Sequence, residues 1–153
     1  MEKELNEAAS RGFVFQAAMG GETSGGGKEV VVAMRRAAEG AAPMRYRLLA
    51  TNRTSTMQKE IRAAAAEGFD YRGQTVFETL FGGKEVVCIM ERDSSRAGAS
   101  AYDYLLVVTS RTSTLQKELQ EAATDGYELL GMTVGETLTG GRELVAITRR
   151  PVR

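Results

Sequence analysis

The chain has 153 residues, and its 20 basic and 20 acidic side chains give a formal net charge of zero. This balance argues against nucleic acid as a partner, because neutralising phosphates normally needs a basic excess or stripe. The sequence has no histidine, which excludes Ser-His and Cys-His nucleophile systems and the usual Cys/His zinc sites. We expect no metal and no cofactor. No apolar run approaches the ~18 residues of a membrane span, and the charged start MEKELNEAAS lacks the apolar segment of a signal peptide. We therefore expect a soluble protein with no membrane partner.

One unit of about fifty residues is repeated three times along the chain. NRTSTMQKE (52–60) returns as SRTSTLQKE (110–118), 58 positions later. The same shift superimposes the pairs Tyr46/Tyr104, Thr51/Thr109, Arg53/Arg111, Gly68/Gly126, Glu78/Glu136 and Glu85/Glu143. A shift of 56 superimposes Met1/Met57, Leu5/Ile61, Gly12/Gly68, Phe13/Phe69 and Glu22/Glu78. We divide the chain into unit 1 (1–36), unit 2 (45–92) and unit 3 (101–150), separated by small, polar linkers.

Unit 1 is predicted to begin with a helix at the first residue and to continue with two strands, the second within GGGKEVVVAM (25–34). It lacks the opening strand and the Arg-Thr-Ser-Thr corner of the other units. Our hypothesis is that the chain is truncated and that a strand once preceded Met1. The loss of that strand would leave an unpaired sheet edge in unit 1, which invites strand exchange.

Units 2 and 3 are each predicted as strand, helix, strand, strand. Their opening runs, YRLLAT (46–51) and YDYLLVVT (102–109), are short and rich in apolar, β-branched or aromatic residues, as strands require. The last two strands of each unit are joined by a loop with a Gly-Gly pair, which supplies positive φ for a hairpin.

The helices of units 2 and 3 have recognisable starts and ends. Ser-x-x-Gln at 55–58 and at 113–116 fits a capping box, in which the side chains satisfy free backbone donors of the first turn. Apolar residues then recur every four positions and give each helix one apolar face. Gly68 and Gly126 follow where a left-handed C-terminal cap is expected.

The closing strands of the units, VVVAM, VVCIM and LVAI, are continuously apolar, and such strands are usually buried on both faces. One helix per unit can cover only one face of its sheet, so the other face must meet the sister units or a second copy of the chain. We predict an α+β fold of three tandem βαββ units, the first without its opening strand. Its antiparallel-rich sheets would pack inward around a pseudo-threefold axis, with the helices outside.

Six charged residues near the hairpin tips are candidate ligand-binding residues: Glu22, Lys28, Glu78, Lys84, Glu136 and Arg142. Each glutamate precedes its cation by six positions, a spacing that can place the two opposite each other across a hairpin and contribute about 0.2–1 kcal/mol. The structural interpretation is a surface salt bridge. The functional interpretation is a ring of three tips that binds a polar ligand or partner, because loop residues on a rigid scaffold are common binding positions.

Arg53 and Arg111 are two further candidates, since they flank helix starts, where the helix dipole does not favour a cation. They indicate either an anion site or a contact with a linker that both units share. Cys88 aligns with Val32 and Ala146 and is predicted to be a small core residue. GGGKE lacks the spacing and the Ser/Thr of a phosphate-binding P-loop. No catalytic residue is predicted.

The segment YDYLLVVTSRTSTLQKELQEAATDGYELLGMTV (102–134) resembles a small bacterial strand-helix-strand-strand domain family of unknown function. The Tyr-rich opening strand, the helix LQKELQEAATDG and the following GYELL carry the resemblance, which implies a fold and no activity. We predict a non-enzymatic repeat protein that assembles with itself or binds an unknown protein or small ligand. The alternative is an enzyme or a small-anion-binding protein that uses the Glu, Lys and Arg residues of the tips.

Overall fold

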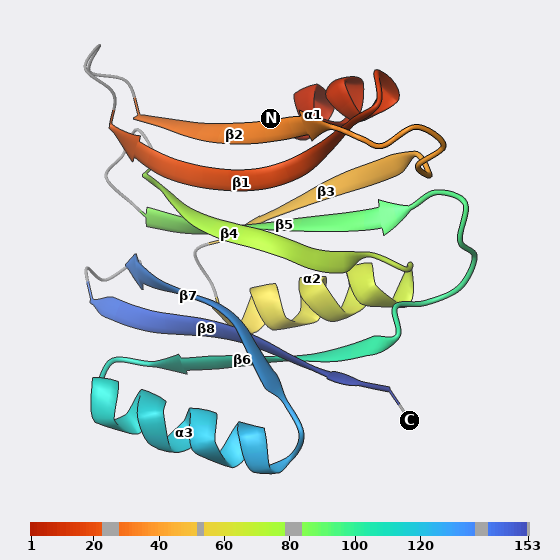
Figure 1. The fold of residues 1–153 in the computed structure, drawn as a ribbon. Coiled ribbons are helices and arrows are strands. Elements are labelled where there is room, and N and C mark those ends of the chain that lie inside the picture. Colours follow the sequence, from red (N-terminus) through yellow and green to blue (C-terminus); the bar gives the residue numbers. More distant parts are fainter. Residues whose placement is uncertain (23–27, 52–53, 79–83, 137–140, 153) are drawn as a thin grey trace.

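The computed structural model describes residues 1–22, 28–51, 54–78, 84–136 and 141–152. These residues form three helices and eight strands (Figure 1): α1 (Glu2–Ser10), β1 (Phe13–Glu22), β2 (Lys28–Arg36), β3 (Met44–Thr51), α2 (Thr54–Ala66), β4 (Asp70–Glu78), β5 (Lys84–Asp93), β6 (Tyr102–Thr109), α3 (Thr112–Thr124), β7 (Glu128–Glu136) and β8 (Arg142–Pro151). All strand pairs are antiparallel. They make sheet A (β1-β2), sheet B (β3-β5-β4) and sheet C (β6-β8-β7). The α+β class and the predicted order of elements in the three units are confirmed.

The three sheets are stacked in a row, with sheet B between sheets A and C (Figure 1). Strand β4 packs on β1 on one side and on β7 on the other, α1 packs on β3 of unit 2, and α2 packs on β6 of unit 3. Among the described residues, the extensive contacts between different units are those that join consecutive units. The row replaces the pseudo-threefold arrangement that we expected around a common axis. Both arrangements cover apolar sheet faces, so the strand pattern does not distinguish them.

Two apolar layers fill the spaces between the sheets. The layer between sheets A and B contains Leu5 and Ala9 of α1 together with Tyr46 and Ile89. The layer between sheets B and C is larger and consists of Leu49, Met57, Ile61, Ala64, Ala65, Phe69, Val86, Cys88, Met90, Tyr104, Val145 and Ile147. Each layer combines one helix with two sheet faces, so neither unit of a neighbouring pair buries its apolar surface alone.

The closing strand β5 belongs to both layers. Its residues from Val86 to Met90 are at most 4% exposed, with Ile89 in the first layer and its neighbours Cys88 and Met90 in the second. The expected burial of a closing strand on both faces is thus confirmed for β5. Cys88 is a fully buried core residue, as predicted, and burial raises the pKa of its thiol.

Gly68 and Gly126 have positive φ, as predicted for a left-handed cap, at 89° and 85°. Gly12 at the end of α1 has the same conformation, with φ of 81°. The predicted N-terminal capping box is wrong for α3. This helix begins at Thr112, and its N-cap residue Arg111 makes no side-chain capping hydrogen bond. Ser113 therefore lies one residue inside the helix, where its hydroxyl is not the cap.

Gly68 and Gly126 form a matched pair for testing these caps. A Cβ at Gly68 would lie 2.5 Å from the backbone oxygen of Gly98, whereas a Cβ at Gly126 would meet nothing within 4 Å. Gly126→Ala should lower the free energy of unfolding by about 1–2 kcal/mol through positive φ alone. Gly68→Ala should cost about 1 kcal/mol more because the linker must also move. Urea denaturation measures both changes, and equal losses would contradict the predicted clash.

Candidate functional site

The three hairpins have the strand register that the six-residue spacing predicts. Glu22 is opposite Lys28, Glu78 is opposite Lys84, and Glu136 is opposite Arg142. The C-terminal ends of β1, β4 and β7, where these glutamates stand, lie on the same side of the stack (Figure 1). The side chain of Arg142 is exposed. The side chains of Glu22, Lys28, Glu78, Lys84 and Glu136 lie outside the described part of the structure, so the salt bridges and the ring of tips stay predictions.

The structure describes one of the two candidate arginines at the helix starts. Arg53 lies outside the described residues. Arg111 has an exposed side chain, and its backbone N–H donates to the Thr109 hydroxyl at 3.3 Å. This contact is local to the β6–α3 corner.

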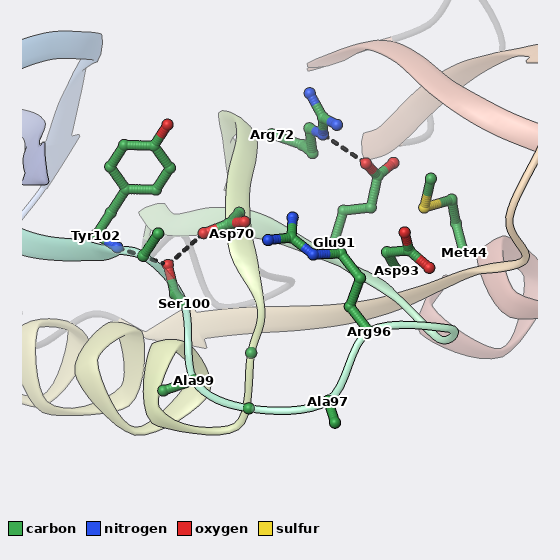
Figure 2. A pocket seen from close by; sticks show the side chains of 13 residues that line it. Met44, Asp70, Arg72, Glu91, Asp93, Arg96, Ala97, Ala99, Ser100 and Tyr102 are labelled. Carbon is green, nitrogen blue, oxygen red and sulfur yellow. Dashed lines mark hydrogen bonds and ion pairs between the residues drawn. The ribbon is translucent and has the colours of Figure 1, made fainter. Parts of the chain in front are cut away.

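A cleft of about 390 Å³ lies between unit 2 and the linker that leads to unit 3 (Figure 2). Its three carboxylates all accept hydrogen bonds from neighbouring groups, and one of them pairs with an arginine of the cleft. The Arg72 Nε lies 2.6 Å from Glu91, which also accepts a hydrogen bond of 2.7 Å from the Tyr46 hydroxyl. On the opposite wall Ser100 donates to Asp70. The Ser100–Asp70 contact ties the linker to unit 2, and together these contacts occupy the carboxylates that an acid-base mechanism would use.

Figure 2 shows Arg96 extending from the linker into this cleft. Among the described residues, no group of three His, Cys, Asp or Glu side chains is placed to hold a metal ion. Further polar contacts lie on the surfaces that join one unit to the next.

A tyrosine of each opening strand reaches a β-bulge in the preceding unit. The Tyr46 hydroxyl accepts from the Phe15 N–H at 2.8 Å, next to the bulge of β1. The Tyr104 hydroxyl accepts from the Tyr71 N–H at 3.0 Å, next to the bulge of β4. Burial raises the pKa of Tyr104 to about 12, and burial followed by the hydrogen bond to Glu91 raises the pKa of Tyr46. Both hydroxyls therefore stay protonated at neutral pH.

Helix α1 hydrogen-bonds the open edge of strand β3 in unit 2. The side chain of Asn6 donates to the Tyr46 carbonyl and accepts from the Tyr46 N–H, both at 2.9 Å. A carboxylate oxygen of Glu2 accepts from the Leu48 N–H at 2.8 Å. These side chains satisfy backbone groups that an edge strand would otherwise leave unpaired.

Helix α2 repeats this arrangement one unit later, on strand β6. Gln58 donates to the Tyr104 carbonyl at 2.9 Å and accepts from the Leu106 N–H at 2.6 Å. Arg62 Nε also donates to the Tyr104 carbonyl, at 3.2 Å. A shift of 56 places Glu2 over Gln58. Gln58 thus bonds a neighbouring strand, whereas the sequence pattern had assigned it to a helix cap.

An aromatic ring of each unit packs on a glycine of the next unit. A Cβ at Gly73 would lie 3.1 Å from the ring of Phe15, and a Cβ at Gly131 would lie 2.5 Å from the Tyr71 hydroxyl. A shift of 56 carries Phe15 onto Tyr71, and a shift of 58 carries Gly73 onto Gly131. Glycine at these positions allows neighbouring β-strands to approach closely.

The same surface occurs a third time on unit 3, where it is exposed. The counterparts of Gln58, Arg62, Tyr71, Gln74 and Val76 form the unit 3 face: Gln116, Gln120, Leu129, Met132 and Val134. Its three apolar residues are 47%, 57% and 49% exposed. At the other end of the stack, Ala17, Met19, Val31 and Ala33 form an exposed unit 1 face.

The sequence itself contains a signal for this interface, in a glycine and an amide that recur between units. The 58-residue shift aligns Gly73 with Gly131 and Gln58 with Gln116. A repeated glycine within a strand indicates a close backbone approach. The alignment does not show that each glycine packs on a ring of a different unit, or that Gln58 binds a strand of a different unit.

Gly20 and Gly21 test the packing of β1 on β4. A Cβ at Gly20 would collide with the backbone oxygen of Val76, whereas a Cβ at Gly21 would meet nothing within 4 Å. Gly20→Ala should lower the free energy of unfolding by about 1–3 kcal/mol, because the strands must separate. Gly21→Ala should be neutral or slightly stabilising. Thermal and urea unfolding measure both variants. Similar losses in the free energy of unfolding would contradict this packing.

The buried Tyr104 predicts a loss of stability at alkaline pH. Unfolded tyrosine titrates near pH 10, and Tyr104 in the folded chain titrates near 12. Between these values the unfolded chain has lost a proton that the folded chain keeps, so stability falls as the pH rises. Over this pH range the free energy of unfolding of the wild type should fall by about 1–3 kcal/mol more than that of Tyr104→Phe.

Urea denaturation at pH 9 and pH 11.5 measures this difference, with Tyr102→Phe on the same strand as the control. Tyr104→Phe should also be less stable at neutral pH by about 1–3 kcal/mol, because the Tyr71 N–H loses its acceptor. Parallel pH profiles for wild type and Tyr104→Phe would contradict the prediction.

Helices long and apolar enough to span a membrane were not found among the described residues. Comparisons of the chain with protein-family models, curated proteins and solved structures gave no match. The resemblance of its units to a strand-helix-strand-strand family therefore stays a prediction.

Proposed function

We propose that the chain is a non-enzymatic self-assembly module whose copies stack head to tail. The unit 3 face of one copy would cover the unit 1 face of the next. One observation carries the proposal: the same contact surface is packed against a neighbour between units 1 and 2 and between units 2 and 3, and it is exposed on unit 3. Repeat proteins that end at a terminal unit usually give it a polar outer face.

The apolar residues at the two ends support this arrangement. Met19 and Val31 on unit 1 are 66% and 49% exposed, and Met132 on unit 3 is 57% exposed. The two groups are on the outermost sheets, A and C, of the stack. A head-to-tail contact would bury both at once, and because it is not self-complementary it can continue from copy to copy.

The sizes of the end residues also match. Inside the chain, Phe15 packs on Gly73 and Tyr71 packs on Gly131. The next pair in this series would be Leu129 of one copy on Ala17 of another. Leu129 is smaller than the aromatic residues in this series, and Ala17 is larger than the glycines. The total volume of the pair therefore changes little, and volume-conserving exchanges are tolerated best in packed layers.

Single charges on the two faces test the assembly. Wild type should form larger species as its concentration rises, whereas Met19→Asp and Met132→Asp should each stop the growth of the stack by placing a carboxylate in the apolar contact. Val152→Asp is the control, because Val152 is 60% exposed but belongs to neither face. Light scattering after size exclusion gives the masses. A wild-type monomer up to about 1 mM would overturn the proposal.

Mixing the two variants distinguishes head-to-tail stacking from self-pairing of a face. Met19→Asp keeps an intact unit 3 face, and Met132→Asp keeps an intact unit 1 face. Each variant alone should be monomeric, and an equimolar mixture should give a dimer that does not grow. If either variant dimerises alone, its intact face binds itself, and the head-to-tail arrangement is wrong.

A further inference from the structure

Strand β2 has an open edge in the described structure, unlike its counterparts in the other units. It pairs with β1 alone, whereas β5 lies between β3 and β4, and β8 lies between β6 and β7. Val32 and Met34 of β2 are partly exposed, whereas their counterparts Cys88 and Met90 in β5 are 0% exposed. Both the backbone edge and the side chains beside it lack the cover that a third strand provides.

A charged residue at this edge lacks the partner that its counterpart has. The Arg36 guanidinium lies over the Phe13 ring at 5.1 Å, just as Arg150 lies over the Tyr127 ring at 4.5 Å. Arg150 also pairs with Asp103 of the neighbouring strand β6 at 3.5 Å. Among the described residues, no carboxylate pairs with Arg36. The arrangement around Arg36 thus shares the cation–ring contact of Arg150 and lacks the carboxylate of the adjacent strand.

We propose that the open edge of β2 accepts an antiparallel strand from a partner polypeptide. The strand carries an acidic residue opposite Arg36 and apolar residues opposite the stretch from Val30 to Met34. Main-chain hydrogen bonds supply the affinity in this mode of recognition, and the alternating side chains supply the specificity. The inference goes beyond the proposed stacking, because it concerns main-chain pairing along the β2 edge, which the face-to-face contact of stacked copies does not use.

The sheets of the same chain define the register of the added strand. In sheet C, Asp103 is opposite Arg150 and Leu106 is opposite Ile147. The two shifts of 58 and 56 together carry Arg150 onto Arg36 and Ile147 onto Ala33. A strand of the β6 type thus places its acidic residue at Arg36 and its fifth residue at Ala33.

The segment 102–109 of this chain, as a free fluorescent peptide, is the probe for this edge. The host protein carries Met132→Asp, which blocks the unit 3 face. Binding of the peptide is therefore measured on a protein that does not stack, whether or not the wild type does. Fluorescence anisotropy should show saturable binding, and the same peptide with Asp103→Lys should bind about two- to fivefold more weakly. Arg36→Glu in the host should reverse this preference. No binding, or the same preference in both hosts, would overturn the proposal.

A crosslinking experiment tests the register. The peptide carries Leu106→Cys as a thiopyridyl disulfide, and the host carries Ala33→Cys or, as the control, Ala17→Cys. The host thiolate attacks the peptide sulfur, and thiopyridone leaves with the electron pair. Both host positions are exposed, and the native Cys88 is fully buried. Ala33→Cys should react at least tenfold faster than Ala17→Cys.

Two outcomes of this experiment would contradict strand addition. Equal rates at the two positions would show that the peptide does not pair with β2. A disulfide-linked dimer that forms in the Ala33→Cys host without peptide, on exposure to air, would show that the edge is covered by a second copy of the chain.

Discussion

The fold depends on one constraint, which is that the closing strand of a unit is apolar on both faces while its own helix can cover only one of them. In unit 2 the second face of β5 is covered by sheet A and α1, and Ile89 is 0% exposed. In unit 1 no described residue covers the corresponding face of β2 in this way, and Val31 is 49% exposed. Stacking of units is therefore the way in which this sequence buries its core.

Stacking creates two local problems, and the repeated polar and small residues solve them. An edge strand packed beneath a helix would leave backbone groups without partners, and the side chains of Asn6 and Gln58 bind those groups directly. Two twisted sheets in contact also bring backbones close together, and Gly73 and Gly131 remove the side chains that would prevent it. Gln58, which the sequence predicted as part of a helix cap, and the two strand glycines thus determine how one unit is positioned on the next.

The sequence was sufficient to predict the units, the two-sided burial of the closing strand in unit 2, the positive φ of Gly68 and Gly126, and the register of Glu78 on Lys84. Each of these follows from a local pattern that has one physical solution. The pattern was not sufficient for the order of stacking, because a ring and a row bury the same strands. It also misplaced Gln58, since an amide one turn into a helix can bond its own helix start or a neighbouring strand with equal chemistry.

A row differs from a ring in one respect that bears on function, because a ring leaves no end and a row always leaves two. The two ends here are not equivalent. Unit 3 presents a helix with Gln116 and Gln120 at the positions that bind an edge strand in the other units, but no strand lies against them in the described structure. Unit 1 presents β2 with an open edge and no opening strand. A strand added at β2 would supply the edge that α3 of another copy is built to bind, so the two open surfaces are consistent with a single mode of assembly.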